Sequence, residues 1–200
     1  MGLHIHNLGG IPVDTDRRYF VYILDYGWKE PLTDTLVQNF TNMARQAAET
    51  ESVVVAGIDP IHFANQVFSW HGINGEDGES VLPAIMVTSL HPEYFKEENN
   101  GHGRRGEEIR DKMLLIPLKE ACNTTEDVIS LIQSVFADIR GGKSVLSFKV
   151  AKELKKDDPN RAMDALMLEP NFMGLGIRIP QALKWITSGW TQSPKGDEPS

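Results

Sequence analysis

The residues of this sequence that could do chemistry include a carboxylate, an amine and two imidazoles. Asp25 and Lys29 are close together in the sequence, and His62 and His71 follow farther along the chain. These residue types serve as general acids, general bases and amine nucleophiles in enzymes. A hydrolase or transferase would need them to meet in one cleft, which a sequence cannot show. Because no partner base is evident beside Lys29, a solvated lysine is the stronger interpretation, and an enzyme is the alternative hypothesis.

Sulfur and metal chemistry find little support in the sequence. Cys122 is the only cysteine, so an intrachain disulfide and a four-cysteine zinc site are both excluded. His4 and His6 would lie on one side of an extended segment, but no third metal ligand accompanies them. Asp77 and Glu79 lack the ligand spacing of a calcium loop. We therefore expect no metal and no cofactor, and a buried, apolar role for Cys122.

Charge argues against a general affinity for nucleic acid. The chain has 20 basic and 28 acidic residues, and its formal net charge is −8. Such a balance opposes attraction to a phosphate backbone. Arg104 and Arg105 could contact phosphate or an acidic partner, but Glu97, Glu98, Glu107 and Glu108 surround them. A solvated loop of mixed charge is the default interpretation.

The sequence has no apolar run of the roughly 20 residues that a membrane helix needs. Its first residues also lack the charged-then-apolar pattern of a secretory signal. We expect a cytoplasmic protein without a membrane segment.

The elements that must position these residues follow from the hydrophobic pattern. Residues 19–26 are β-branched, aromatic and almost uninterrupted, which favours a strand covered on both faces. Pro31 suits the first turn of the helix that follows, and Thr124 begins a strong helix N-terminus. The predicted order is β-α-β-α-β-β-α, with strands at 19–26, 52–58, 81–88 and 112–119 and helices at 32–49, 61–70 and 125–140.

This order predicts one α/β domain with additions at both ends. The predicted parts are an N-terminal segment at 1–18, the domain at 19–142 with a loop insertion at 91–111, an α+β extension at 143–190 packed on the core, and a disordered tail at 191–200. The extension is rich in large apolar residues, which we expect to pack on the core or to form a docking patch.

The pattern resembles the thioredoxin fold in three respects. The element order over about 19–141 is similar to that of the family's three-layer core. The strand ending in Asp25 leads into Trp28-Lys29-Glu30-Pro31-Leu32, at the position of the family's Trp-Cys-Gly-Pro-Cys. Leu82-Pro83 begins a run that looks like the family's strand entered through a cis-proline, beside the active site, so Pro83 is the candidate cis residue.

The resemblance implies a protein without thiol–disulfide activity. Lys29 and Leu32 stand at the two cysteine positions, and neither can supply a thiolate. Thr33 is the nearest hydroxyl and is expected to cap the helix. Asp25 resembles the family's buried acid and is expected to have a hydrogen-bonded structural role.

The resemblance therefore implies a redox-inactive binding subunit or adaptor with protein partners. In thioredoxins the matching face holds extended polypeptide, and free backbone groups beside the proline strand could pair with a peptide. A doubly wound, flavodoxin-like sheet is a third possibility, against which the antiparallel proline strand argues. The expected binding residues are Trp28, Lys29, Glu30, Pro31, Leu32, Leu82, Pro83, Arg104 and Arg105.

Overall fold

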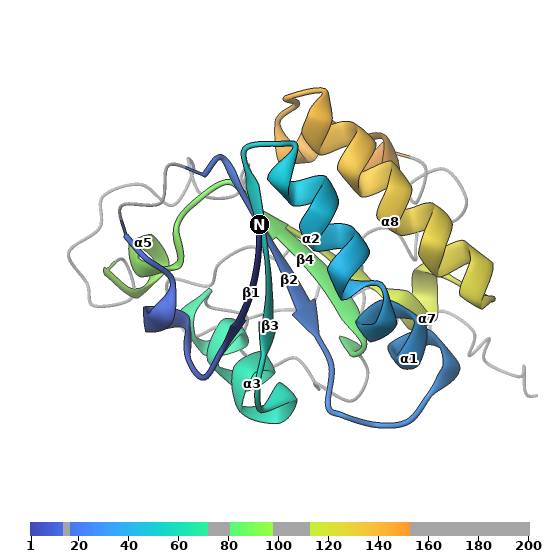
Figure 1. Ribbon diagram of the computed structural model, residues 1–200, viewed down its shortest axis with the longest axis horizontal. Helices are drawn as coiled ribbons and strands as arrows, with labels where there is room; N and C mark the ends of the chain where they lie inside the picture. Colours follow the sequence, from blue (N-terminus) through green and yellow to red (C-terminus); the bar gives the residue numbers. More distant parts are fainter. Residues whose placement is uncertain (14–16, 72–80, 98–112, 153–200) are drawn as a thin grey trace, which may run out of the picture.

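The computed structural model describes residues 1–13, 17–71, 81–97 and 113–152. These residues form a five-stranded mixed sheet with helices on both faces (Figure 1). The predicted α/β class is confirmed. Several predicted features lie outside the described residues, namely Arg104 and Arg105, most of the 91–111 loop, and the part of the C-terminal extension and tail from 153 onward.

The sheet combines parallel and antiparallel strands in the order β1-β3-β2-β4-β5. Strands β1 and β2 run parallel to β3, whereas β4 is antiparallel to β2 and β5 is antiparallel to β4. The antiparallel β4 rules out an all-parallel doubly wound sheet. The strands are β1 (Gly2–Ile5), β2 (Tyr19–Leu24), β3 (Ser52–Gly57), β4 (Ala84–Thr88) and β5 (Met113–Pro117).

Strand β2 lies at the centre of the sheet and all six of its residues are buried. Because alternate side chains of a strand point to opposite faces, β2 contributes to two hydrophobic clusters. Tyr19, Val21 and Ile23 belong to one cluster, and Phe20 and Tyr22 belong to the other. Figure 1 shows α2 (Phe40–Ala48) and α8 (Thr125–Arg140) over one face, with α3 (Pro60–Trp70) on the other.

The helices begin and end mostly where the sequence predicts. Pro31 is the first residue of α1, and Thr124 caps α8 in a capping box with Asp127, which confirms both predicted starts. The helical elements are η1 (Leu8–Gly10), α1 (Pro31–Gln38), α2 (Phe40–Ala48), α3 (Pro60–Trp70), α5 (Pro92–Glu97), α7 (Leu118–Ala121), α8 (Thr125–Arg140) and η3 (Val145–Ser147).

The single helix predicted over 32–49 is wrong, because Asn39 separates α1 from α2. The Asn39 side chain donates to the Thr35 carbonyl oxygen at 2.8 Å, and its backbone N–H points to the carbonyls of Thr35 and Val37. Asparagine side chains compete in this way for helical carbonyl groups. The apolar periodicity continues across the break and so conceals it.

All four predicted strands are shorter in the structure, and those predicted over 19–26 and 52–58 end at Leu24 and Gly57. The strand predicted over 81–88 begins at Ala84, since Pro83 has no N–H for the ladder, and the Leu82–Pro83 bond is cis as predicted. The strand predicted over 112–119 ends at Pro117, which is the N-cap of α7.

The N-terminal segment supplies an edge strand that the sequence analysis does not predict. Residues Gly2 to Ile5 pair with Val54 to Gly57 of β3. Only Ile5 in this strand is buried, so the strand has no apolar run to reveal it. The consequence for the site is that His4 lies beside the carboxyl end of β3.

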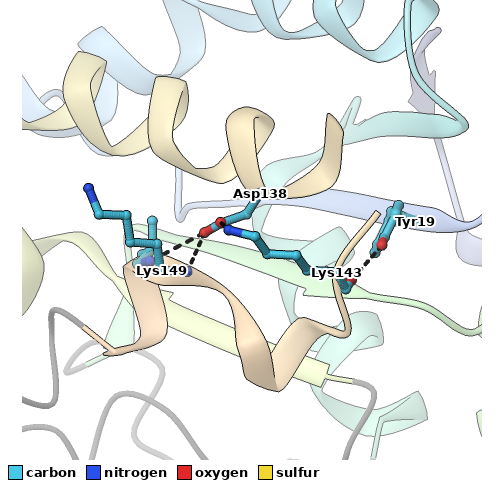
Figure 2. Close-up of polar contacts among 5 residues, drawn as sticks. Tyr19, Asp138, Lys143 and Lys149 are labelled. Atoms are coloured by element: carbon cyan, nitrogen blue, oxygen red, sulfur yellow. Dashed lines mark hydrogen bonds and ion pairs between the residues drawn. The ribbon is translucent and has the colours of Figure 1, made fainter. Parts of the chain in front are cut away.

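Residues 143–152 are held on the core by a buried carboxylate. Asp138 of α8 pairs with Lys143, and it also accepts the backbone N–H groups of Lys149 and Val150 at 2.5 and 3.3 Å. The Tyr19 hydroxyl donates to the Lys143 carbonyl oxygen at 2.5 Å (Figure 2). Two separate contacts therefore anchor this segment to the sheet and to α8.

In the parts of the chain that the structure describes, no helix is both long and apolar enough to cross a membrane.

Candidate functional site

The predicted site residues begin at the carboxyl end of β2. Asp25 follows this strand, on the same side as Ile23, and its exposed fraction is only 7%. Its Oδ1 accepts the backbone N–H of Gly27 at 2.6 Å, which agrees with the hydrogen-bonded role expected for it. Gly27 has a φ of 72°, a conformation that glycine adopts without strain. Burial raises the pKa of the Asp25 carboxyl, and the bond from Gly27 offsets part of this rise.

The turn after Gly27 is held by an aromatic ring and an ion pair. Trp28 packs against Tyr26 with ring centroids 5.5 Å apart. Lys119 lies over the Trp28 ring at 5.5 Å, and its Nζ is 3.3 Å from the Glu30 carboxylate. Lys119 belongs to α7, so α7 fixes the turn that leads into α1.

Pro83 lies close to the same turn. Leu24 pairs with Ala84 across β2 and β4, which places Pro83 next to the end of β2. The Pro83 carbonyl oxygen accepts the N–H of Leu118 at 2.8 Å, and Leu118 precedes Lys119. Both Leu82 and Pro83 are buried. Their side chains therefore offer little surface, and the carbonyl of Pro83 is already occupied.

Residues of the same turn line an open groove of about 300 Å³. Asp25, Trp28 and Lys29 line it, together with residues of α1 and of the ends of β1 and β3. The remaining lining residues are His4, Ile23, Gly27, Thr33, Asp34, Val37, Phe40, Ala56, Gly57 and Pro60.

Some of these lining residues were not predicted as site residues. His4 reaches the groove because β1 joins the sheet, and its ring lies 4.1 Å from that of Phe40. At Gly57 a Cβ would overlap Phe63 of α3, so glycine permits the close approach of that helix. The only sequence signal for His4 is its spacing with His6, which would place both histidines on one side of an extended segment. Among the described residues, no group of three or more histidine, cysteine or acidic residues could hold a metal ion.

Thr33 does not cap α1, contrary to the prediction. The N-cap is Glu30, which makes no side-chain capping bond, and Thr33 is the third residue of the helix. Thr33 is buried and lines the groove. The proline at the first helical position leaves no N–H there to be capped.

The four residues of the alternative enzyme site are not brought together. Asp25 and Lys29 line the groove, whereas His62 and His71 do not. His62 is exposed on α3. His71 is buried, its Nδ1 lies 2.8 Å from the Val67 carbonyl oxygen, and its ring packs against Tyr22 on the opposite face of the sheet. Burial lowers the pKa of His71 to about 4, although the bond to Val67 opposes this shift.

Cys122 is buried against the cluster that includes α8, as expected for an apolar role. Burial raises the pKa of its thiol to about 11, and the negative charge of Asp127 adds to this shift. A thiol with such a pKa is almost fully protonated at neutral pH and is a poor nucleophile.

A second hollow, of about 470 Å³, lies at the amino ends of β2 and β3. Arg17, Arg18 and Arg140 line it, but Glu49 and Glu51 lie among them. Its mixed charge favours no particular ligand.

Comparisons with known proteins assign no family to this chain: no family model, no curated protein and no solved structure matches it.

Proposed function

We propose that this chain is a redox-inactive, thioredoxin-like protein that binds protein partners through its turn surface, defined as Trp28 to Leu32 together with Lys119. The single observation that carries the proposal is the neighbourhood of this turn and the cis-proline. Leu118 bonds to Pro83, and the next residue, Lys119, contacts both Trp28 and Glu30. The resemblance implies that these two segments, distant in sequence, lie side by side.

The sheet agrees with the proposed family. The strand that follows the cis bond is antiparallel to β2, and the helix that follows the turn begins at Pro31. Lys29 and Leu32 occupy the positions where the family has cysteines, and Cys122 is buried elsewhere. A fold can retain a binding surface after losing its chemistry.

The turn surface contains one tryptophan, Trp28, a residue type that is enriched at protein interfaces. Trp28 remains 43% exposed although Tyr26 and Lys119 both contact its ring. A tryptophan held in place by a cation and by a second ring loses little entropy when a partner covers it. Because Pro83 and Leu82 are buried, the turn carries the proposed binding, and peptide pairing at the Pro83 carbonyl would require Leu118 to be displaced.

Affinity purification with matched variants tests the binding role. The full chain, Trp28→Ala and the control Ile129→Ala are purified under native conditions, and co-eluting proteins are quantified by mass spectrometry. Ile129 is 40% exposed on α8 and does not belong to the turn surface. We expect the wild type and Ile129→Ala to retain the same partners and Trp28→Ala to lose them. Equal recovery by all three would contradict the proposal.

A cysteine graft tests the thioredoxin-like scaffold separately. Lys29→Cys/Leu32→Cys places two thiols three residues apart at the start of α1, where the proposed family has its pair. We expect this variant to form an intramolecular disulfide under mild oxidation and to exchange it with a small dithiol, whereas Lys29→Cys alone forms none. Thiol counting and intact mass measure the change. A folded double variant that stays reduced would refute the proposed equivalence.

A further inference from the structure

One buried polar group in the groove is a carboxylate without a charged partner. Asp25 is 7% exposed and lines the groove. Its Oδ1 accepts the N–H of Gly27. Among the residues that the structure describes, no ion pair involves Asp25, since the described pairs are Lys119–Glu30 and Lys143–Asp138. A buried, ionised carboxylate is costly unless it is paired, so this group favours a ligand that brings a positive charge.

The walls of the groove are mainly apolar. The side chains of Trp28, Val37, Phe40 and Pro60 line it. Trp28 and Val37 are among the large hydrophobic residues that remain exposed. Apolar walls above a carboxylate suit a ligand with a methylene stem and a charged head, because such side chains bury the stem and pair the head.

We propose that the groove receives a lysine side chain of a partner polypeptide, with its ammonium group at Asp25 and its methylene stem against the apolar walls. This inference rests on the proposed binding function and names the chemistry of the partner. The charges agree with it, because the chain has a formal net charge of −8. Asp34 adds a second carboxylate to the lining.

The hydrogen bond from Gly27 favours lysine over arginine. A guanidinium group binds a carboxylate most strongly through two parallel bonds, one to each oxygen. One oxygen of Asp25 already accepts the Gly27 N–H at 2.6 Å, so one of the two lone pairs of that oxygen is used. An ammonium group is a point charge and needs only the other oxygen.

Lys29 opposes the proposed ligand. It is exposed and lines the same groove, so its ammonium group repels an incoming cation. Removing this charge should strengthen binding two- to fivefold.

The test is a titration of the full-length, ¹⁵N-labelled chain followed by NMR. The probes are N-acetyl-lysine methylamide, its arginine analogue and its uncharged norleucine analogue. We expect the lysine probe to shift the amide signals of Gly27 and Gly57 and the indole signal of Trp28, all in the lining, and the norleucine probe to bind at least tenfold more weakly. Asp25→Asn should weaken lysine binding at least tenfold, Lys29→Gln should strengthen it, and the exposed α8 control Glu126→Gln should leave it unchanged.

The ¹³C signal of the Asp25 carboxyl gives a readout that a merely structural role would not move. Burial raises the pKa of this group, and a bound ammonium should lower it again. The other titratable groups in the groove are His4 on β1, Lys29 in the turn and Asp34 on α1. The lining contributed by β3 and α3, which is Ala56, Gly57 and Pro60, has none. The pKa shift should therefore persist in His4→Gln.

Three results would overturn the inference: equal binding of the lysine and norleucine probes, unchanged lysine binding by folded Asp25→Asn, or tighter binding of the arginine probe than of the lysine probe. These results leave the proposed function standing if Trp28→Ala still loses the partners that the wild type retains. Lysine-selective binding with no partner lost in Trp28→Ala would instead refute the turn surface as the binding surface.

Discussion

Single residues decide the chemical character of this protein. The same burial acts on Asp25 and His71 in opposite senses: it raises the pKa of the carboxyl and lowers that of the imidazole. In both cases burial shifts the pKa toward the neutral form, because a low-dielectric environment disfavours charge. Asp25 opens into a groove, whereas His71 is enclosed against Tyr22 and Phe95. Only Asp25 can therefore meet a ligand directly.

Asp25→Asn should stabilise the protein at pH 7. Because the folded state raises the Asp25 pKa above 3.8, the folded protein holds this proton more tightly than the unfolded chain does. The free energy of unfolding therefore falls as pH rises through this window and stays lower at neutral pH. Asparagine retains an acceptor for Gly27 without the charge.

Urea unfolding of both forms at pH 7 and below pH 3.8 measures the Asp25 effect. The gain should be present at pH 7 and should shrink in acid, where the wild-type carboxyl is also neutral. A variant that is less stable than the wild type at pH 7 would show that ionised Asp25 contributes to folding.

At the scale of elements, the buried Asp138 side chain of α8 caps a helical turn in the segment that follows α8. The backbone N–H groups of Lys149 and Val150 lie at the start of the helical turn that runs to Lys152, the last described residue. The carboxylate of a different helix, α8, accepts both (Figure 2). Such groups need partners when they are buried. The last described segment is thus fastened to α8 through backbone bonds.

Asp138→Ala should cost about 2–4 kcal/mol of stability, since it leaves buried donors unpaired. Lys143→Ala should cost much less, about 1 kcal/mol or below. The Lys143 side chain is 44% exposed, and its bond to Tyr19 uses the backbone carbonyl, which the substitution keeps. Thermal or urea unfolding of both variants provides the comparison. Equal losses of stability in the two variants would show that the Asp138–Lys143 ion pair, rather than the bonds to the backbone N–H groups, holds this segment on the core.

Elements with strong local sequence signals could be predicted, whereas elements that depend on contacts with other parts of the folded chain could not. The apolar runs gave β2 and β3 because both are covered on two faces, and Thr124 marked α8 through its own capping bond. Strand β1 exists because β3 offers it an edge, which no feature of its four residues reveals. The break at Asn39 depends on one side-chain bond within a continuing apolar periodicity.

The candidate site likewise has parts that the sequence predicts and parts that only the folded structure reveals. The resemblance to the thioredoxin fold implies that Trp28 and Pro83 lie near each other, and the structure contains the expected cis bond at Pro83 and the expected α1 start at Pro31. The groove was not predictable, because His4, Phe40 and Gly57 come from three elements that meet only in the folded sheet. The occupied Pro83 carbonyl also depends on a residue 35 positions away, Leu118.

At the scale of the whole molecule, stability should fall in mild acid. The pKa of His71 is about 4 in the folded protein against 6.5 ordinarily. The His71 imidazole therefore binds a proton near pH 6.5 in the unfolded chain, whereas in the folded protein it binds one only near pH 4. The free energy of unfolding should drop as pH falls through this window, by up to about 3 kcal/mol.

Urea unfolding between pH 7 and pH 4.5 follows the acid effect, with His71→Gln as the comparison. Glutamine can still donate to the Val67 carbonyl but does not titrate, so the variant should lose stability less steeply as pH falls. Asp25 acts in the opposite sense, as shown above, and is the same in both proteins. Parallel pH profiles would exclude His71 as the source.

The alternation of β2 between the two clusters limits how the chain can change in length. Deleting or inserting one residue within Tyr19–Leu24 would turn every later side chain of the strand to the other face. Asp25 would then leave the groove for the side of α3, and apolar residues would exchange layers. The turn from Tyr26 to Glu30 is not a strand, so its side chains do not alternate between two faces in this way. Natural variation in length should therefore be absent from β2.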